Sequence, residues 1–198
     1  AHQKTIGQIA ADRTMDIGVI QVTAKDDKTV KQMVADGKQF SFNNGTYVAM
    51  YAGYDKYYNG DVGAWIYLPK SVAGACVMAY CDNYVATWMA PAGVQRGQIT
   101  YTHGQLKRLT DNEIGELYIN NINTSKNCGP AYGECLYGQK TALKKNSSLN
   151  RINVRRCLNF IEKNLKYALE PYLFQQNTPN TRASAKNVID SFLNRVKA

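Results

Sequence analysis

The sequence predicts a mixed α/β (α+β) fold, in which a mixed β-sheet is flanked by helices and two amphipathic helices end the chain. Helix-like and strand-like patterns alternate in the N-terminal part, apolar runs rich in β-branched and aromatic residues follow, and helical spacing of apolar residues dominates after residue 150. The chain has 198 residues, of which 44% are hydrophobic. We therefore expect one domain over residues 1–198, with its own core.

The N-terminal part predicts the order helix, strand, helix. Ile6, Ile9 and Ala10 form a short helical stripe, and residues 16–23 are an apolar run typical of a buried strand. Asp26 or Asp27 could cap the next helix. Its apolar face would carry Val30, Met33 and Val34.

The middle of the chain predicts two strands, at residues 46–54 and 62–69. Glycine-containing turns at 43–45 and 58–61 precede them. Six of the fourteen tyrosines fall between Tyr47 and Tyr67. Such density is typical of the half-buried face of a sheet, and an interaction surface is the alternative.

A helix with a small contact face is predicted to begin at Ser71, which would allow close approach to the sheet. That face consists of Val72, Ala73, Gly74, Ala75 and Ala79. A loop at 86–97 and a possible strand at 98–102 follow. Thr110 and Glu113 have the offset of a capping box, which predicts a further helix through Leu117.

The last part of the chain predicts a polar loop at 120–134, an irregular strand at 132–143 and helices at about 150–169 and 182–197. The first helix has cap candidates in Ser147, Ser148 and Asn150, and the following helix carries apolar residues on one side. The apolar positions of the two helices are Val154, Leu158, Ile161, Leu165 and Leu169, then Ala185, Val188, Ile189, Phe192 and Val196.

The positive charge is concentrated in the last third. Residues 1–137 carry twelve Lys or Arg and twelve Asp or Glu, whereas residues 138–198 carry twelve basic residues and three acidic ones, Glu162, Glu170 and Asp190. The net charge of +9 therefore lies around the two final helices. This distribution favours an acidic partner, although a lone basic helix is more often simply a solvated face.

The sequence offers little support for enzyme chemistry, and we expect no catalytic residues, no metal site and no cofactor. The two histidines are His2 and His103, without a nucleophile motif to pair with either, and phosphate-binding glycine motifs are absent. The five cysteines lack zinc spacing, so we interpret them as reduced and mostly buried. No apolar run reaches the length of a membrane span. Nucleic-acid binding remains an alternative on charge alone, without a recognition motif.

Seven short stretches resemble, in chain order, the sheath proteins of contractile phage tails and related injection machines. They are IAADRTMDIGVI, LPKSVAGACVMAYCDN, TWMAPAG, LYINNINTSKNCG, LYGQKTAL, INVRRCLNFIEKNL and FQQNTPNTRASAKNVIDSFL. Departures from the family pattern include AGY at 52–54, a single proline before Ser71, and Cys157 in place of a usual leucine.

The resemblance implies the conserved C-terminal, inner domain of a tail sheath subunit, a non-enzymatic virion protein made in the host cytoplasm. Copies would assemble helically around the tail tube and contract to drive it through the host envelope. Implied partners are other sheath subunits and the tail tube protein, with the baseplate and tail terminator as further candidates. Membrane insertion and nucleic-acid binding are not expected. We also expect a fragment, or a chain whose flanking parts are missing, because the family's strand-exchanging terminal arms are not visible.

The resemblance places three groups of candidate site residues. The last helix is the expected tube-facing element, although the helix before it is the alternative. An inter-subunit contact or a structural clamp is expected on that earlier helix, and the family motif loop is a third group. These groups are Arg182, Lys186, Arg195 and Lys197; Arg151, Arg155, Arg156, Lys163 and Lys166; and Trp88, Pro91 and Gly93.

Overall fold

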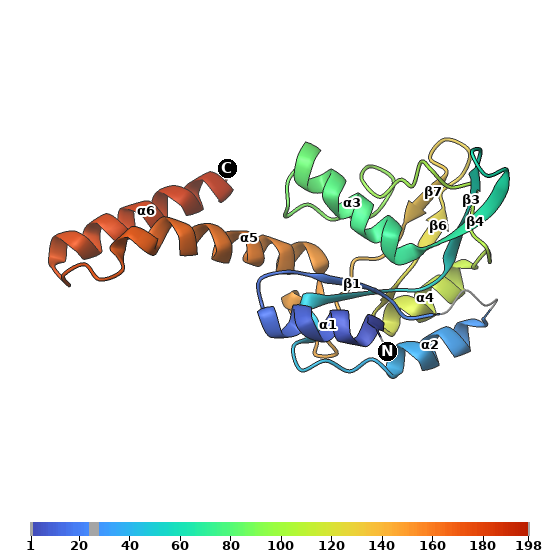
Figure 1. Ribbon diagram of the computed structural model, residues 1–198, viewed down its shortest axis with the longest axis horizontal. Coiled ribbons are helices and arrows are strands. Elements are labelled where there is room, and N and C mark those ends of the chain that lie inside the picture. Colours follow the sequence, from blue (N-terminus) through green and yellow to red (C-terminus); the bar gives the residue numbers. More distant parts are fainter. Residues whose placement is uncertain (1, 24–27, 198) are drawn as a thin grey trace. The chain divides into compact units, whose positions relative to one another are not determined.

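The computed structural model describes residues 2–23 and 28–197. They form two compact units, Ala1–Arg156 and Cys157–Ala198. The mixed α/β fold is confirmed, with a parallel sheet, two antiparallel hairpins and flanking helices (Figure 1). One core domain over 1–198 stays a prediction.

The first unit is built on a three-stranded parallel sheet in the order β1-β2-β5. The strands are β1 (Gly18–Gln21), β2 (Val48–Tyr51) and β5 (Ile122–Asn123). Parallel strands need both faces covered, which explains why the two longer ones are apolar runs rather than alternating patterns. Both strands were predicted, within longer segments.

Successive residues of β2 point into two different cores, because side chains alternate across a strand. Val48 and Met50 pack with β1 and with helices α1 (His2–Arg13), α2 (Val30–Lys38) and α4 (Asp111–Ile119). Ala49 and Tyr51 pack on the opposite face with helix α3 (Lys70–Tyr84). Figure 1 shows α1, α2 and α4 on one side of the sheet and α3 on the other.

The predicted contact face of α1 is confirmed at Ala10 and wrong at Ile6 and Ile9. Ile6 and Ile9 are 46% and 52% exposed, whereas Gly7, Ala10 and Ala11 are buried. Residues with short side chains form the buried face because the helix packs closely against its neighbours. A Cβ added at Gly7 would lie 2.5 Å from the Phe42 ring.

The helix start before α2 also differs from the prediction. Thr29 caps α2 in a reciprocal capping box with Gln32. The predicted caps, Asp26 and Asp27, lie outside the described residues. The capping box of Thr110 and Glu113 at α4 is confirmed.

An antiparallel hairpin follows β2, and its first strand begins inside the single strand predicted at 46–54. Gly53, with φ of 94°, ends the expected strand 46–54 early, and the chain enters the antiparallel pair β3 (Tyr54–Asn59) and β4 (Ala64–Pro69). Of the six clustered tyrosines, Tyr58 is the exposed one, and Tyr51 is fully buried. Their interpretation as part of a half-buried sheet surface is confirmed.

The predicted loop at 120–134 instead contains β5 and a second antiparallel pair, β6 (Ser125–Asn127) and β7 (Glu134–Leu136). Four of its polar residues, Asn123, Thr124, Ser125 and Glu134, are buried, and backbone carbonyls accept hydrogen bonds from the first two. Asn123 Nδ2 donates to Met50 O at 3.0 Å and to Lys140 O at 2.7 Å. The predicted strand 132–143 is much shorter, and 98–102 contributes one isolated bridge, Gln98 with Cys135.

Three short 3-10 turns and two long helices complete the described chain. The turns are Gly45–Tyr47, Ser148–Asn150 and Glu170–Tyr172, and the helices are α5 (Ile152–Leu169) and α6 (Pro179–Lys197). Ser147 caps the second turn, and Thr178 accepts a hydrogen bond from Thr181 N at the start of α6. The helix begins earlier than predicted because Pro179 is favourable in a first helical turn.

In the second unit, α6 runs back along the Cys157–Leu169 part of α5 (Figure 1). Phe160 and Phe192 contact each other with ring centroids 6.1 Å apart. The predicted apolar stripe of α6 is half-buried, and its basic residues are exposed. No residue of α6 is fully buried.

Candidate functional site

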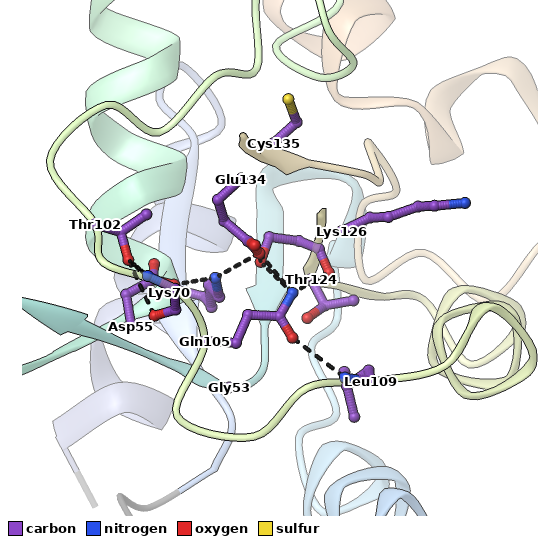
Figure 2. A network of polar contacts seen from close by, with 12 residues as sticks. Gly53, Asp55, Lys70, Thr102, Gln105, Leu109, Thr124, Lys126, Glu134 and Cys135 are labelled. Atoms are coloured by element: carbon purple, nitrogen blue, oxygen red, sulfur yellow. Dashed lines mark hydrogen bonds and ion pairs between the residues drawn. The ribbon is translucent and has the colours of Figure 1, made fainter. Parts of the chain in front are cut away.

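Two carboxylates share one ammonium group in the interior of the first unit. Lys70 Nζ donates to Asp55 Oδ1 and lies 3.4 Å from Glu134 Oε1. Asp55, Lys70 and Glu134 are 0%, 1% and 6% exposed. They come from β3, the first turn of α3 and β7, so the cluster joins elements that are distant in sequence (Figure 2).

Uncharged donors complete the network around Glu134. Its Oε1 atom accepts hydrogen bonds from Ser125 Oγ and Gln105 Nε2. Gln105 Nε2 also donates to Ser125 O at 2.9 Å, and its Oε1 accepts from Leu109 N at 3.3 Å. Figure 2 shows Glu134 from β7 and Gln105 from the 102–109 segment pointing toward each other, while Lys126 points away. Buried charges retained in this way need such partners.

Burial raises the pKa of the Asp55 carboxyl, against the opposing effect of the Lys70 ammonium. The charge on Glu134 raises the same pKa further. No local sequence pattern predicted this cluster, because Lys70 occupies an ordinary position at the start of a helix. Asp55 lies in β3 and Lys70 directly follows β4, so the available sequence signal was that one hairpin brings these two residues close together.

The arginine pair on α5 is buried and not solvated. Arg155 is 4% exposed and lies over the Tyr47 ring, with 4.4 Å from Cζ to the centroid. Arg156 is 5% exposed, donates to Met78 O at 3.1 Å, and forms an ion pair with Asp82. These contacts fasten the start of α5 to a turn before β2 and to α3.

Arg151, at the residue before α5, is exposed and lies beside Tyr118 of α4. Its Nη1 atom donates to the Tyr118 hydroxyl, and Lys140 Nζ lies 4.5 Å from the centroid of the same ring. Burial and the charge on Arg151 lower the pKa of Lys140. Lys163 and Lys166, further along α5, are exposed.

The motif loop is fixed by backbone contacts to β7. Gly93 has φ of 81° and donates its N–H to Leu136 O at 2.8 Å. Gly97 closes the loop by donating to Gly93 O at 2.7 Å. Pro91 is buried and Trp88 is half-buried. Nearby, Ala90, Ala92 and Gly93 line a cavity of about 610 Å³ together with α4.

The candidate tube-facing residues on α6 are all exposed. Lys186 pairs with Asp190 at 2.8 Å, and Arg182 Nη1 donates to Asn177 Oδ1 at 3.0 Å. Arg195 and Lys197 lie in the last turn, where positive charge is favourable to the helix dipole. The predicted groups therefore differ: the α6 group is entirely exposed, whereas the α5 group is mixed, with Arg155 and Arg156 buried and the other three residues exposed.

Other chemistry is sparse in the described part of the chain. No group of three or more potential metal-ligating side chains occurs among residues 2–23 and 28–197. The same residues include no helix that is both long and apolar enough to cross a membrane. His103 packs edge-on against Trp65, with ring centroids 5.4 Å apart. All five cysteines are free, and two of them, Cys81 and Cys135, are buried, fewer than we expected.

No protein-family model matches the chain. It is similar to the tail sheath protein of Vibrio phage KVP40, with 38% identity over 144 residues, which are 73% of this chain and 21% of that protein. It is also similar to the tail sheath protein of Enterobacteria phage T4, with 35% identity over 187 residues, which are 90% of this chain and 28% of that protein. The chain is homologous to tail sheath proteins.

The fold agrees with this tail sheath relationship. The structure matches the contracted helical sheath of the anti-feeding prophage with a TM-score of 0.67 and 26% identity. The match covers 78% of this chain and 41% of the sheath chain. The chain spans between about a fifth and three tenths of the length of the two phage tail sheath relatives. Nucleic-acid binding finds no support among these proteins.

Proposed function

We propose that the chain is the core part of a contractile tail sheath subunit. Copies assemble helically around a tail tube, and their contraction drives the tube through the host envelope. The 38% identity to a phage tail sheath protein is the observation that carries the proposal, and the match to a contracted helical sheath supports it. The role is structural and non-enzymatic, and it places the protein in the virion after synthesis in the host cytoplasm.

Assembly requires surfaces for the tail tube and for other subunits, and the candidates are helix α6 and the exposed cations of α5. The α6 helix carries four exposed cations and has no fully buried residue. We assign it to the contact with an acidic tube surface. Exposed ion pairs contribute about 0.2 to 1 kcal/mol each, which suits a grip that must release when the sheath widens.

The arginines at the start of α5 have a different proposed role. Arg155 and Arg156 act as a clamp within the subunit, since their charged groups are already engaged by Tyr47 and Asp82. Arg151, Lys163 and Lys166 remain exposed and are the better candidates for contacts between subunits. The Trp88–Gly93 loop contacts β7 through Gly93 and lines a cavity together with α4, so it shapes this part of the subunit surface. Baseplate and tail terminator proteins are further proposed partners at the ends of the assembly.

Electron microscopy tests the proposed function directly. The chain is expressed within its longer sheath protein, purified and imaged at increasing concentration. Tubular assemblies, with or without a tube inside, are the expected result. A monodisperse subunit that forms no tubes under any condition that assembles a known sheath protein would contradict the proposal.

Measuring DNA binding distinguishes the sheath proposal from the alternative of a nucleic-acid-binding domain. A nucleic-acid-binding domain that neutralises several phosphates must show a steep fall of affinity with salt, on logarithmic axes. We expect weak binding with a shallow slope, because Arg155 and Arg156 at the start of α5 are buried and unavailable to phosphates.

A further inference from the structure

The cluster of Asp55, Lys70 and Glu134 has one more carboxylate than it has ammonium groups. Lys70 contacts both carboxylates, and all three side chains are almost fully buried. Removing a carboxylate from water without its own counter-ion costs several kcal/mol, and a second carboxylate beside it adds repulsion. Binding one proton between the two carboxyls removes both penalties and leaves the cluster neutral.

The hydrogen bonds distinguish the two carboxyl groups. Three donors converge on Glu134 Oε1, namely Lys70, Ser125 and Gln105, an arrangement that suits a carboxylate acceptor. Asp55 Oδ1 accepts from Lys70, while the buried Oδ2 atom has no hydrogen-bond partner among the described residues. The nearby Thr102 hydroxyl is within hydrogen-bond distance of the Lys56 and Gly104 carbonyls, and its smaller interaction with the Asp55 carboxylate lowers the Asp55 pKa without outweighing burial. Oδ2 is therefore the least costly place for a proton.

Other titratable and polar groups around the cluster do not replace this proton. Burial raises the pKa of the Tyr101 hydroxyl, and the nearby Asp55 charge raises it further. The hydroxyl therefore stays neutral. Burial raises the pKa of Cys135 to about 12, so that thiol also stays neutral. Lys126 pairs with Asp111 at 2.9 Å, away from the cluster. The groups that face the cluster or stand beside it on β3, α3, β6, β7 and the 101–105 segment are Asp55, Lys70, Ser125, Lys126, Glu134, Cys135, Tyr101, Thr102, His103 and Gln105.

We propose that Asp55, Lys70 and Glu134 form a buried proton-binding site, in which the two carboxyls share one proton at pH values where exposed carboxyls are ionised. The proton enters from solvent and returns to it. Because the site joins the β3–β4 hairpin to the β6–β7 hairpin, loss of the proton leaves a net negative charge at that junction and weakens it. This role is independent of the proposed sheath function.

The cluster shares its contacts with the segment that connects the two hairpins, so its charge affects the junction. The 103–106 segment lies between the hairpins and pairs with β3. The His103 and Leu106 amides donate to the Lys56 and Tyr54 carbonyls, and the Lys56 amide donates to the Gly104 carbonyl. Gln105 then reaches from this segment to Ser125 and Glu134. Deprotonation acts on the same side chains that hold the segment to β7.

Infrared difference spectroscopy tests the site on the chain itself. At about pH 6, roughly two units above ordinary carboxyl pKa values, exposed Asp and Glu are almost fully ionised. The unaltered protein should still show the carbonyl band of one protonated carboxyl. Asp55→Asn and Glu134→Gln should each lose that band, since one remaining carboxylate pairs with Lys70 without a proton. The exposed Glu116→Gln control should retain it.

Potentiometric titration provides a second readout that tolerates a partly destabilised variant. Over the pH range in which the carboxyl band of the unaltered protein disappears, the folded protein should release one more proton per molecule than Glu134→Gln does. Absence of the carboxyl band in the unaltered protein at about pH 6 would overturn the proposal, as would its persistence in both cluster variants. Equal proton release by the unaltered protein and Glu134→Gln would overturn it too.

Discussion

The guanidinium of Arg155 lies over the ring of Tyr47, with 4.4 Å between its Cζ atom and the ring centroid. Both residues belong to the first unit, but they are far apart in sequence, on α5 and on the turn before β2. Arg155 belongs to the most basic part of the chain, but this contact buries it and holds α5 against the turn before β2. It explains why the start of α5 is well packed despite its charge.

Arg155→Gln should destabilise the protein by about 1 to 3 kcal/mol, because it removes a desolvated cation–π contact and its hydrogen-bonding capacity. Arg155→Lys should recover only part of this, since a point charge does not stack as a planar guanidinium does. Urea unfolding provides the measurement. Lys166→Gln, an exposed position on the same helix, is the control and should change stability by less than about 0.5 kcal/mol. An equal effect at both positions would contradict the clamp.

Gly74→Val should cost about 1 to 3 kcal/mol through overpacking. A Cβ at Gly74 would lie 2.6 Å from the Tyr51 ring, which is fully buried and cannot yield easily. Gly115→Ala on α4 is the matched control, because no atom lies within 4 Å of its added Cβ. That control should stabilise the helix by up to about 1 kcal/mol. Thermal unfolding should therefore shift in opposite directions, and shifts of the same sign would refute the packing explanation.

Iodoacetamide should modify Cys76 quickly in the folded protein and leave Cys81 and Cys135 intact. Cys76 is exposed, whereas the other two thiols are buried. Burial raises the pKa of both, and for Cys135 the value reaches about 12, helped by a hydrogen bond with Cys128. Reaction requires the thiolate, so protection should vanish only on unfolding. Mass spectrometry of peptides identifies the modified sites, and early labelling of Cys135 would be inconsistent with this packing.

Folding stability should fall as the pH rises through the raised pKa of Asp55. The folded state holds the proton more tightly than the unfolded state, so this contribution is complete below the ordinary aspartate pKa and is lost above the folded one. Asp55→Asn cannot titrate and should flatten this part of the pH profile. Urea midpoints measured across that window give the comparison. A profile unchanged by the substitution would show that Asp55 does not titrate there.

Charge reversal on α6 should weaken association with an acidic tail tube. The double variant Arg182→Glu, Arg195→Glu loses two exposed cations, each contributing about 0.2 to 1 kcal/mol, and adds repulsion. The effect should be larger at low salt, where charges are less screened. The double variant Lys31→Glu, Lys38→Glu changes exposed residues of α2 and serves as control. Undiminished co-sedimentation with tubes would remove α6 from the tube interface.

Local patterns in the sequence determined most helices and the two longer parallel strands. The capping box of Thr110 and Glu113, the periodicity of α5 and α6, and the apolar runs of β1 and β2 each act within a few residues of chain. The ordered motifs also identified the sheath relationship before any geometry was available. Such signals are local, so the sequence displays them directly.

Only the tertiary structure decided which polar groups are buried and what they contact. The polar stretch 120–134 contains β5 and β6, and its Asn123 is buried because carbonyls of Met50 and Lys140 accept its hydrogen bonds. Arg155 and Arg156 share a helix with exposed Lys163, and nothing in their spacing separates a clamp from a solvated face. Asp55, Lys70 and Glu134 meet only when two hairpins dock. Charge patterns show how many charges a segment carries, whereas the dielectric environment of each charge depends on residues far away in the chain.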